Sequence, residues 1–331
     1  MVEQEFKTID ISKTIEFIKN IYTKGYLIGP IKCKCGSQNF NIYKDSSYKI
    51  NGCSFSCSNY KCKKKYPITI NSFFDKFSHQ NIMLIAEIMK CFLCLDLNAK
   101  RCLEYIIKNL NYFVSERTVR NVYTEMRKII TKYLKILYQS ERLGYKDLHK
   151  NFSVDESLIN HFENRQIWLL GACDNETKEF RIEAAYTRDT ATLKEFINTF
   201  IEPGNNIITD GWAGYNFLDQ PNSGYIRYAH NHGGGNFGLG FESTSHVESI
   251  WSQVKAKIKE NYHIFPYKVF MRFVREIEFK IRIRSLNFDK KIDKFFECYK
   301  LCNQIEDSAL KSENSIFLDD DLKSDSDNEE D

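Results

Sequence analysis

The sequence has no uninterrupted apolar stretch long enough to cross a membrane. Its longest apolar run, IMLIAEIMKCFLCL at residues 82–95, is interrupted by Glu87 and Lys90, so a core helix is the better interpretation. The opening residues, MVEQEFKTID, lack the basic and apolar regions of a secretory signal, and we expect a protein that is not secreted. In such a protein the eleven cysteines are expected to be reduced thiols or metal ligands rather than disulfides.

The formal net charge of +3 conceals an uneven distribution along the chain. From Glu313 to the end there are nine acidic residues and one lysine, a balance of −8, which leaves +11 on the first 312 residues. A basic body with an acidic tail favours a polyanionic ligand such as nucleic acid, although ordinary surface lysines would give the same count. The composition of the last twenty residues predicts disorder.

Four cysteines are spaced as two pairs. Cys33 and Cys35 form C-x-C-G, Cys57 and Cys62 form C-x4-C, and 21 residues separate the inner cysteines. Two thiolate pairs on turns can close a tetrahedral Zn²⁺ site, and the short strands expected between them predict a zinc ribbon. Cys53 could replace Cys57 in another register, and free cysteines in a loop are the alternative. The other six cysteines lie in apolar or helical patterns and are expected in the core: Cys91, Cys94, Cys102, Cys173, Cys298 and Cys302.

The next segment, from about Ser78 to Gln139, has helical periodicity. AKRCLEYIIKNL is joined through NYFV to SERTVRNVYTEMRKI, which is the outline of a helix-turn-helix with Arg117, Arg120 and Asn121 on its free face. A plain helical linker with a charged exterior is the alternative. The lysines around the last ribbon cysteine would contact DNA phosphates or form a solvated loop: Lys61, Lys63, Lys64 and Lys65.

The pattern changes to mixed α/β beyond residue 150. NFSVDES, RQIWLLGACD, KEFRIEAAYT, NNIITD and GYIRYAHN predict strands, ATLKEFINTFI predicts a helix before the fourth strand, and DNETKE predicts a hairpin turn. A glycine-rich loop precedes a helix expected from about Ser245 to Glu260. A further helix, FMRFVREIEFKIRIR, could present a basic face to DNA or to solvent, with Arg272, Arg275, Lys280, Arg282 and Arg284.

Three carboxylates recur at notable points of this pattern. NFSVDES is expected to end its strand on Asp155, NNIITD ends on Asp210, and Glu248 lies on the late helix. The order of strand, hairpin, strand, helix, strand and late helix matches a ribonuclease-H-like fold, in which these side chains converge. Three carboxylates repel one another unless cations are present, so two Mg²⁺ ions about 4 Å apart are expected. Taken singly, each carboxylate could equally be a solvated strand end.

The motifs VDES, IWLLGACD, EPGNNIITDGWAGY and HVESIWSQVK together resemble the Merlin superfamily of DDE transposases and their bacterial insertion-sequence relatives. The resemblance runs from about Cys33 to about Ser285. It implies that Asp155, Asp210 and Glu248 are the catalytic triad, at spacings of 55 and 38 residues. It also implies zinc-supported folding and cut-and-paste transposition with Mg²⁺ or Mn²⁺. The shortened C-x-C pair and the acidic tail depart from the family pattern.

Further residues follow from this resemblance. The family has an Asn-His before the last helix, which matches Asn231 and His232, a His two positions before the Glu, which matches His246, and a Lys beyond it, which matches Lys255. With Arg117 and Arg120, the two histidines and Lys255 are the DNA-binding candidates, although both histidines could be core or cap residues. Trp212 and Trp251 are expected to pack rather than to stack on bases. The implied partners are double-stranded DNA, namely terminal inverted repeats and target, and a second copy of the chain.

The expected organisation has five parts: an N-terminal helix and linker (1–30), a zinc ribbon (31–75), a helical DNA-binding segment (76–145), a ribonuclease-H-like domain (146–290) and a C-terminal helix with a disordered acidic tail (291–331). Two other functions remain open: a domesticated DNA-binding protein without catalysis, and a structure-selective nuclease. The location would be nuclear in a eukaryotic host and cytoplasmic in a bacterium, with no membrane association.

Overall fold

The computed structural model describes residues 10–162, 165–230, 245–261 and 267–304. The chain divides into two compact units, one of Met1–Ile129 with Leu286–Lys300 and one of Ile130–Ser285 with Leu301–Asp331. The finer five-part division stays a prediction, and the acidic tail lies outside the described residues. No helix in the described ranges is both long enough and apolar enough to cross a membrane.

The first unit begins with α1 (Ile11–Thr23) and a small antiparallel sheet in the order β1 (Phe40–Lys44), β2 (Cys53–Cys57) and β3 (Lys65–Pro67). Asp10 caps α1 because its Oδ1 accepts hydrogen bonds from the backbone N–H groups of Ser12 at 2.8 Å and Lys13 at 3.3 Å. Strand β2 is the middle strand and is buried, as Phe55 at its centre shows. The predicted strands between the cysteine pairs are therefore confirmed.

The helical part of the first unit contains a 3₁₀ turn (Phe73–Phe77), α2 (Ile82–Leu93), α3 (Ala99–Tyr105) and a π-helical turn (Ile106–Leu110). Helices α4 (Glu116–Ser140) and α8 (Phe288–Gln304) belong to this unit as far as Ile129 and Lys300, and their remaining residues belong to the second unit. The run at 82–95 is the core helix that its pattern predicted, since eight residues of α2 are buried. Helix α8 joins this unit through aromatic rings: Phe73 packs on Phe295 with centroids 5.4 Å apart, and Tyr26 stacks on Phe296 at 4.2 Å.

The second unit contains a five-stranded sheet in the order β6-β5-β4-β7-β8. Its strands are β4 (Asn151–Phe162), β5 (Arg165–Asp174), β6 (Phe180–Ala185), β7 (Asn206–Asp210) and β8 (Ile226–His230). The first three pair antiparallel, whereas β7 pairs parallel with both β4 and β8, after the crossover through α5 (Thr190–Phe200). This topology confirms the predicted ribonuclease-H-like α/β core.

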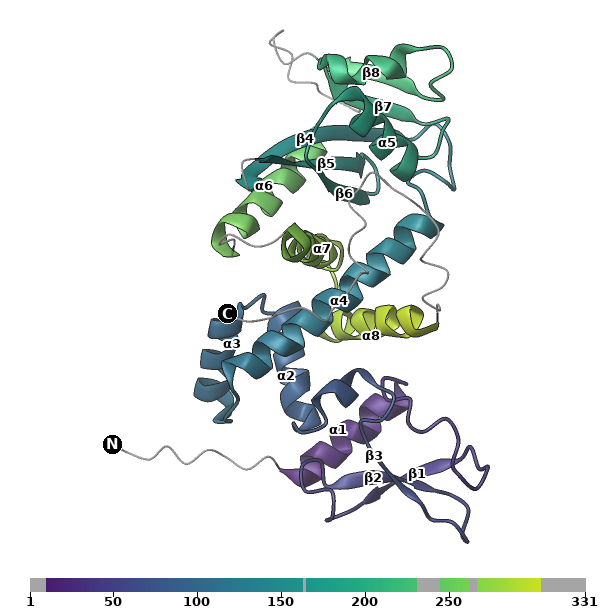
Figure 1. The fold of residues 1–331 in the computed structure, drawn as a ribbon, viewed down its shortest axis with the longest axis vertical. Coiled ribbons are helices and arrows are strands. Elements are labelled where there is room, and N and C mark those ends of the chain that lie inside the picture. The colour runs from purple at the N-terminus through teal and green to yellow at the C-terminus, as the bar shows by residue number, and fades with distance from the viewer. Residues whose placement is uncertain (1–9, 163–164, 231–244, 262–266, 305–331) are drawn as a thin grey trace, which may run out of the picture. The chain divides into compact units, whose positions relative to one another are not determined.

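Two helices cover one face of this sheet, α6 (Ser245–Asn261) and α7 (Tyr267–Arg282) (Figure 1). Their buried face carries Val247, Trp251 and Phe270, among others, and packs on alternate residues of β5 and β6 such as Leu169 and Ile182. Successive side chains of a strand point to opposite faces, so alternate residues of β5 and β6 contact these helices. Strand β6 is buried along its whole length, so its opposite face is covered as well. One core cluster of the second unit therefore lies between β5, β6 and the two helices.

Two expectations about this unit were wrong. Strand β4 does not end on Asp155 but continues to Phe162, because β5 pairs with it as far as Arg165. The basic residues of α7 do not form an exposed face: Arg275 is 7 % exposed and pairs with Glu183 and Glu278, and Arg282 also pairs with Glu278. The guanidinium groups neutralise buried carboxylates instead of facing a polyanion.

Candidate active site

Asp155 and Asp210 lie at matching positions on neighbouring strands. The parallel pairing of β4 and β7 matches Ser153 with Ile208, and each aspartate follows two residues later. Since side chains two residues apart on a strand point to the same face, both carboxylates lie on the face of the sheet to which Ser153 and Ile208 point. The negative charge of Asp210 contributes to the raised pKa of Asp155.

Asp155 faces α6, and Trp251 of that helix holds its carboxylate. The indole Nε1–H donates a hydrogen bond to Asp155 Oδ2 at 3.0 Å, and Trp251 is only 4 % exposed. Gly171 of β5 is the cross-strand partner of Asp155 and makes room for the indole. A Cβ on Gly171 would lie 2.5 Å from Trp251 Cζ2, so any larger residue would displace the ring. The expected packing role of Trp251 is confirmed, with the hydrogen bond added.

The environment of Asp155 opposes its charge. Burial is the main cause that raises its pKa to about 6, and the neighbouring carboxylate of Glu156 adds to the shift, against hydrogen bonds from the Glu156 N–H and Trp251. A carboxylate in this position gains from a cation, which would neutralise the charge that burial penalises. The site therefore has the electrostatic character of a metal-binding position.

Asp210 ends β7 on a turn. Its Oδ1 accepts a hydrogen bond from the backbone N–H of Trp212 at 3.0 Å, in the manner of an Asx turn. Arg227 of β8 fixes the same strand end, since its guanidinium donates to Thr209 Oγ1 at 3.0 Å and to the Asp210 carbonyl at 3.1 Å. The prediction that β7 delivers a carboxylate at its tip is confirmed.

Glu248 lies in the first turn of α6 and its side chain is exposed. The residues around it on the helix are buried: Val247 packs near Gly171, and Trp251 contacts Asp155. Lys255, two turns further on, is exposed as well. Glu248 therefore lies at the N-terminal end of α6, the helix whose Trp251 contacts Asp155 of β4. The catalytic assignment of the three carboxylates stays a prediction.

The two histidine predictions are not tested. His232 lies outside the described residues, and for His246 the structure describes the helical backbone but not the side chain. Trp212, in contrast to Trp251, is 42 % exposed, so its expected packing role is only partly met. Its ring lies against Arg188, whose guanidinium carbon is 4.5 Å from the ring centroid.

Sequence reasoning missed the role of the second acid in VDES, Glu156. Its side chain is on the opposite sheet face from Asp155 and accepts hydrogen bonds from Tyr215 Oη at 2.6 Å and Arg188 Nη1 at 2.9 Å. Arg188 in turn lies over Trp168, with its guanidinium carbon 4.3 Å from the ring centroid. A second acid directly after Asp155, whose side chain must point to the opposite face of the strand, was the available signal.

Carboxylates are ligands of Mg²⁺ and Mn²⁺, and the donor set of Asp155, Asp210 and Glu248 fits such ions. Among the described residues, the four ribbon sulfurs form a group close enough to hold an ion, within 4.8 Å of one another, and the three carboxylates do not form such a group. The raised pKa of Asp155, caused chiefly by burial, favours a cation beside these carboxylates.

The four predicted zinc ligands form one cluster. Cys33 Sγ is 3.6 Å from Cys62 Sγ, and Cys35 Sγ is 3.6 Å from Cys57 Sγ. Four sulfurs at about 2.3 Å from a tetrahedral Zn²⁺ are about 3.8 Å apart, so this cluster fits zinc. Cys53 is fully buried in β2 outside the cluster, and burial raises its pKa to about 11. The alternative ligand set with Cys53 is therefore wrong.

Two side chains donate hydrogen bonds to the cluster. Tyr66 Oη donates to Cys33 Sγ at 3.3 Å, and Asn59 Nδ2 donates to Cys35 Sγ at 3.7 Å. The backbone N–H of Cys35 and the Tyr66 hydroxyl lower the pKa of Cys33 to about 6, which favours the thiolate that zinc needs. Of the six remaining cysteines, Cys94 is half-buried and the others are buried in the core, as expected.

The helical DNA-binding candidates lie at the start of α4. Arg117 and Arg120 are exposed, and Arg120 Nε donates to Glu116 Oε1 at 2.9 Å one turn away. The preceding helix and π-helical turn end at Asn111, whose positive φ of 54° reverses the chain before α4. Two helices joined by a short turn are therefore present, while their contact with DNA stays a prediction.

We call Asp155, Asp210 and Glu248 the acidic row. Together with the strand order, these residues define a ribonuclease-H-like α/β domain with a carboxylate site. Residues 138–281, which contain Asp155, Asp210 and Glu248, match the model of the ISXO2-like transposase domain. No curated protein matches the chain.

Two matches among solved structures come from retroviral complexes or domains. A chain of the simian T-cell lymphotropic virus intasome in complex with the PP2A regulatory subunit B56 gamma is 12 % identical, with 42 % of this chain and 50 % of that chain covered and a TM-score of 0.29. The HTLV-2 integrase catalytic core domain in complex with magnesium is 13 % identical, with 51 % and 94 % covered and a TM-score of 0.24. This chain spans about half the length of the first. The fold assignment rests on strand order and on the family model.

Proposed function

We propose that this protein is a DDE transposase that cuts the ends of a mobile element and joins them to target DNA. The observation that carries the proposal is the acidic row: Asp155 and Asp210 follow matched positions on adjacent parallel strands, and Glu248 begins the helix whose Trp251 contacts Asp155. All three lie within the transposase domain. The motifs VDES, TDGWAGY and HVESIW support a place in the Merlin superfamily.

Asp155, Asp210 and Glu248 would hold two Mg²⁺ or Mn²⁺ ions. When bound, the ions neutralise the carboxylates, activate the attacking oxygen and stabilise the leaving oxygen, so no histidine base is required. The protein's own residues hold the carboxylates in position: Trp251 orients Asp155 through its N–H, and the Trp212 backbone N–H orients Asp210.

The reaction would have two phosphoryl-transfer steps. In the first, a water oxygen forms a bond to phosphorus at the element's end, the bond to the 3′ oxygen breaks, and that oxygen leaves with the electron pair and gains a proton. In the second, the freed 3′-OH attacks a target phosphodiester and loses its proton, while the target's 3′ oxygen leaves. The second step exchanges one phosphodiester for another and needs no external energy source.

The other parts of the chain would bind DNA. One structural Zn²⁺ held by Cys33, Cys35, Cys57 and Cys62 would stabilise the ribbon, and the start of α4 would contact the terminal repeat through Arg117 and Arg120. Lys255, exposed on the same helix as Glu248, would contact a phosphate. Joining two ends requires at least two copies of the chain. The site of action is the nucleus in a eukaryote and the cytoplasm in a bacterium.

A cleavage assay tests this function. The protein is mixed with DNA that carries the inverted repeats flanking its own locus, with Mg²⁺ or Mn²⁺, beside Asp210→Asn. The matched control is Asp147→Asn, which removes an exposed carboxylate from the loop before β4. We expect cutting at the repeat ends by the protein and by the control, and at least about a hundredfold loss in Asp210→Asn.

Other outcomes would select the alternatives. Binding of the repeats without cutting under any divalent ion would indicate a domesticated DNA-binding protein. Cutting of branched DNA without a requirement for repeats, and without joining, would indicate a structure-selective nuclease. Equal activity of Asp210→Asn and Asp147→Asn would remove Asp210 from the catalytic site.

A further inference from the structure

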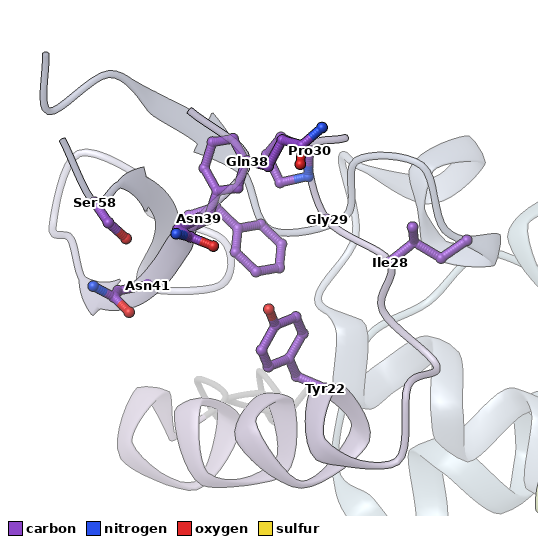
Figure 2. A pocket seen from close by; sticks show the side chains of 10 residues that line it. Tyr22, Ile28, Gly29, Pro30, Gln38, Asn39, Asn41 and Ser58 are labelled. Atoms are coloured by element: carbon purple, nitrogen blue, oxygen red, sulfur yellow. The ribbon is translucent and has the colours of Figure 1, made fainter. Parts of the chain in front are cut away.

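A concave site lies beside the four-cysteine ribbon in the first unit. It has a volume of about 350 Å³ and is formed by α1, by the loop at residues 28–30, by the start of β1 with the two residues before it, and by Phe55 and Ser58 in and after β2. Figure 2 shows Tyr22 rising from α1 toward the loop and strand residues that close the other sides. Sites for small molecules usually have about 300–1,000 Å³, so this one can hold a single ring system.

The floor of the site is aromatic and fixed in place. Phe55 of β2 is fully buried, and its ring centroid is 5.4 Å from that of Tyr22 in a tilted arrangement. Gly29 has a φ of +75°, and a Cβ there would lie 3.1 Å from Phe55 Cζ, so glycine permits the close approach of the ring. Tyr22 itself is 38 % exposed and offers part of its ring to a ligand.

The rim of the site is polar. Gln38, Asn39, Asn41 and Ser58 line it and are exposed. Within the described residues, no intramolecular hydrogen bond uses the side-chain amide of Gln38, Asn39 or Asn41. Three amides with free donors and acceptors around an aromatic floor match the edge of a nucleobase, which presents both kinds of group beside a flat face.

The surroundings favour a polyanion. Residues 31–67 contain eight lysines and one acidic residue, Asp45, a balance of +7. Four thiolates with Zn²⁺ add −2, which leaves +5. Asp45 is engaged by Lys65, at 2.7 Å between Nζ and Oδ2, so it does not offset the lysines near the site. Lys32, Lys34 and Lys61 are exposed. This charge decides for a nucleotide over a neutral peptide.

We infer that this site binds one unpaired nucleobase of the DNA that the protein acts on. A base within a duplex shows only its edge in a groove and cannot enter a concave site, whereas an unpaired base can stack on Tyr22 and meet the amides of Asn39 and Asn41. The lysines of the ribbon then contact the flanking phosphates. The inference rests on the proposed function for the identity of the DNA, and it assigns to the ribbon the recognition of a single-stranded end.

The test measures fluorescence anisotropy of the zinc-loaded full chain with two labelled duplexes, one blunt and one with a five-nucleotide 3′ overhang. We expect the overhang duplex to bind about tenfold more tightly, as base stacking on aromatic residues implies. The double variant Asn39→Ala/Asn41→Ala should lose most of this preference. Asn20→Ala is the matched control, since it removes an exposed amide from α1 outside the site.

The outcomes separate this inference from the proposed function. Asp210→Asn should keep the overhang preference although it loses cleavage, because the two sites are distinct. Equal binding of both duplexes by the parent protein overturns the inference, and so does an unchanged preference in the double variant, even if cleavage at the repeats is confirmed. Zinc content and circular dichroism of the double variant, equal to those of the parent, show that it is folded.

Discussion

The indole N–H of Trp251 and the carboxylate of Asp155 are joined by a hydrogen bond of 3.0 Å that links α6 to β4. The late helix is therefore not only the carrier of Glu248. It also sets the orientation of the central carboxylate, and any shift of α6 changes two members of the acidic row together. If the proposed activity holds, this coupling makes the position of α6 one of its determinants.

Asp155 predicts a pH dependence of stability in metal-free protein. Its pKa is raised to about 6 in the folded state, against about 3.9 when unfolded. Between these values the folded state binds more protons, so the free energy of unfolding falls as pH rises from about 4 to about 6, and it stays lower above that range. We expect Asp155→Asn to melt at a higher temperature than the parent at pH 8 and at a similar one near pH 4.

Mg²⁺ should reverse this difference, since a cation neutralises the charge that burial penalises. Thermal melts with zinc-loaded protein, with and without Mg²⁺, measure both effects. The prediction would be contradicted if Mg²⁺ left the melting temperature of the parent protein at pH 8 unchanged. It would also be contradicted if Asp155→Asn melted at a lower temperature than the parent at pH 8 without metal.

Gly171→Ala should destabilise the second unit. The new Cβ would lie 2.5 Å from Trp251 Cζ2, so the ring must move away from Asp155. We expect a loss of about 1–3 kcal/mol in the free energy of unfolding, measured by urea denaturation. In the double variant with Trp251→Leu the clash is absent. Its loss of unfolding free energy should therefore be smaller than the sum of the losses in the two single variants. Strict additivity would mean that the residues do not interact.

Zinc content distinguishes the ligand sets. Cys57→Ser should lose most of its bound zinc because it removes one of four clustered sulfurs. Cys53→Ala should keep one zinc per chain, since Cys53 lies in the core of the ribbon away from the cluster. Elemental analysis of the purified variants gives the answer. Loss of zinc in Cys53→Ala with retention in Cys57→Ser would reverse the assignment.

Arg275→Met should be strongly destabilising without a direct effect on DNA binding. Its guanidinium donates to Glu183 and Glu278 in the interior. Its removal takes the ion pair from the buried Glu183 and leaves Glu278 to Arg282, at a cost of about 3–5 kcal/mol. Arg284→Met, at an exposed position bonded to Gln253, should change stability by no more than about 0.5 kcal/mol. Urea denaturation compares them, and equal losses would show that the buried pairs are not specific.

The sequence predicted the sheet well because its strands alternate or run apolar over short lengths, and the turns between them are marked by DNETKE and by Pro203-Gly204. It predicted the cluster of four cysteines because the two cysteines of each pair are close together in the sequence. The end of β4 was missed, since the polar residues beyond Ser157 hide a pairing with β5 that only the register reveals. The basic face of α7 was misjudged for a similar reason. Charge counts do not show that Glu183, Glu278 and Glu179 lie opposite Arg275 and Arg282.

The extension of β4 beyond Asp155 has a mechanical consequence. Asp155 is paired with Gly171 and has paired neighbours on both sides, so its backbone cannot shift without disturbing the sheet. Asp210, by contrast, is the last residue of β7, and its carboxylate is fixed by the turn that begins with Trp212. One carboxylate is anchored in mid-strand and the other depends on a turn. The Asp210 backbone is itself paired with His230 and held by Arg227, so distances within the site change by movement of the Asp210 side chain out of this turn and not by a shift of the sheet.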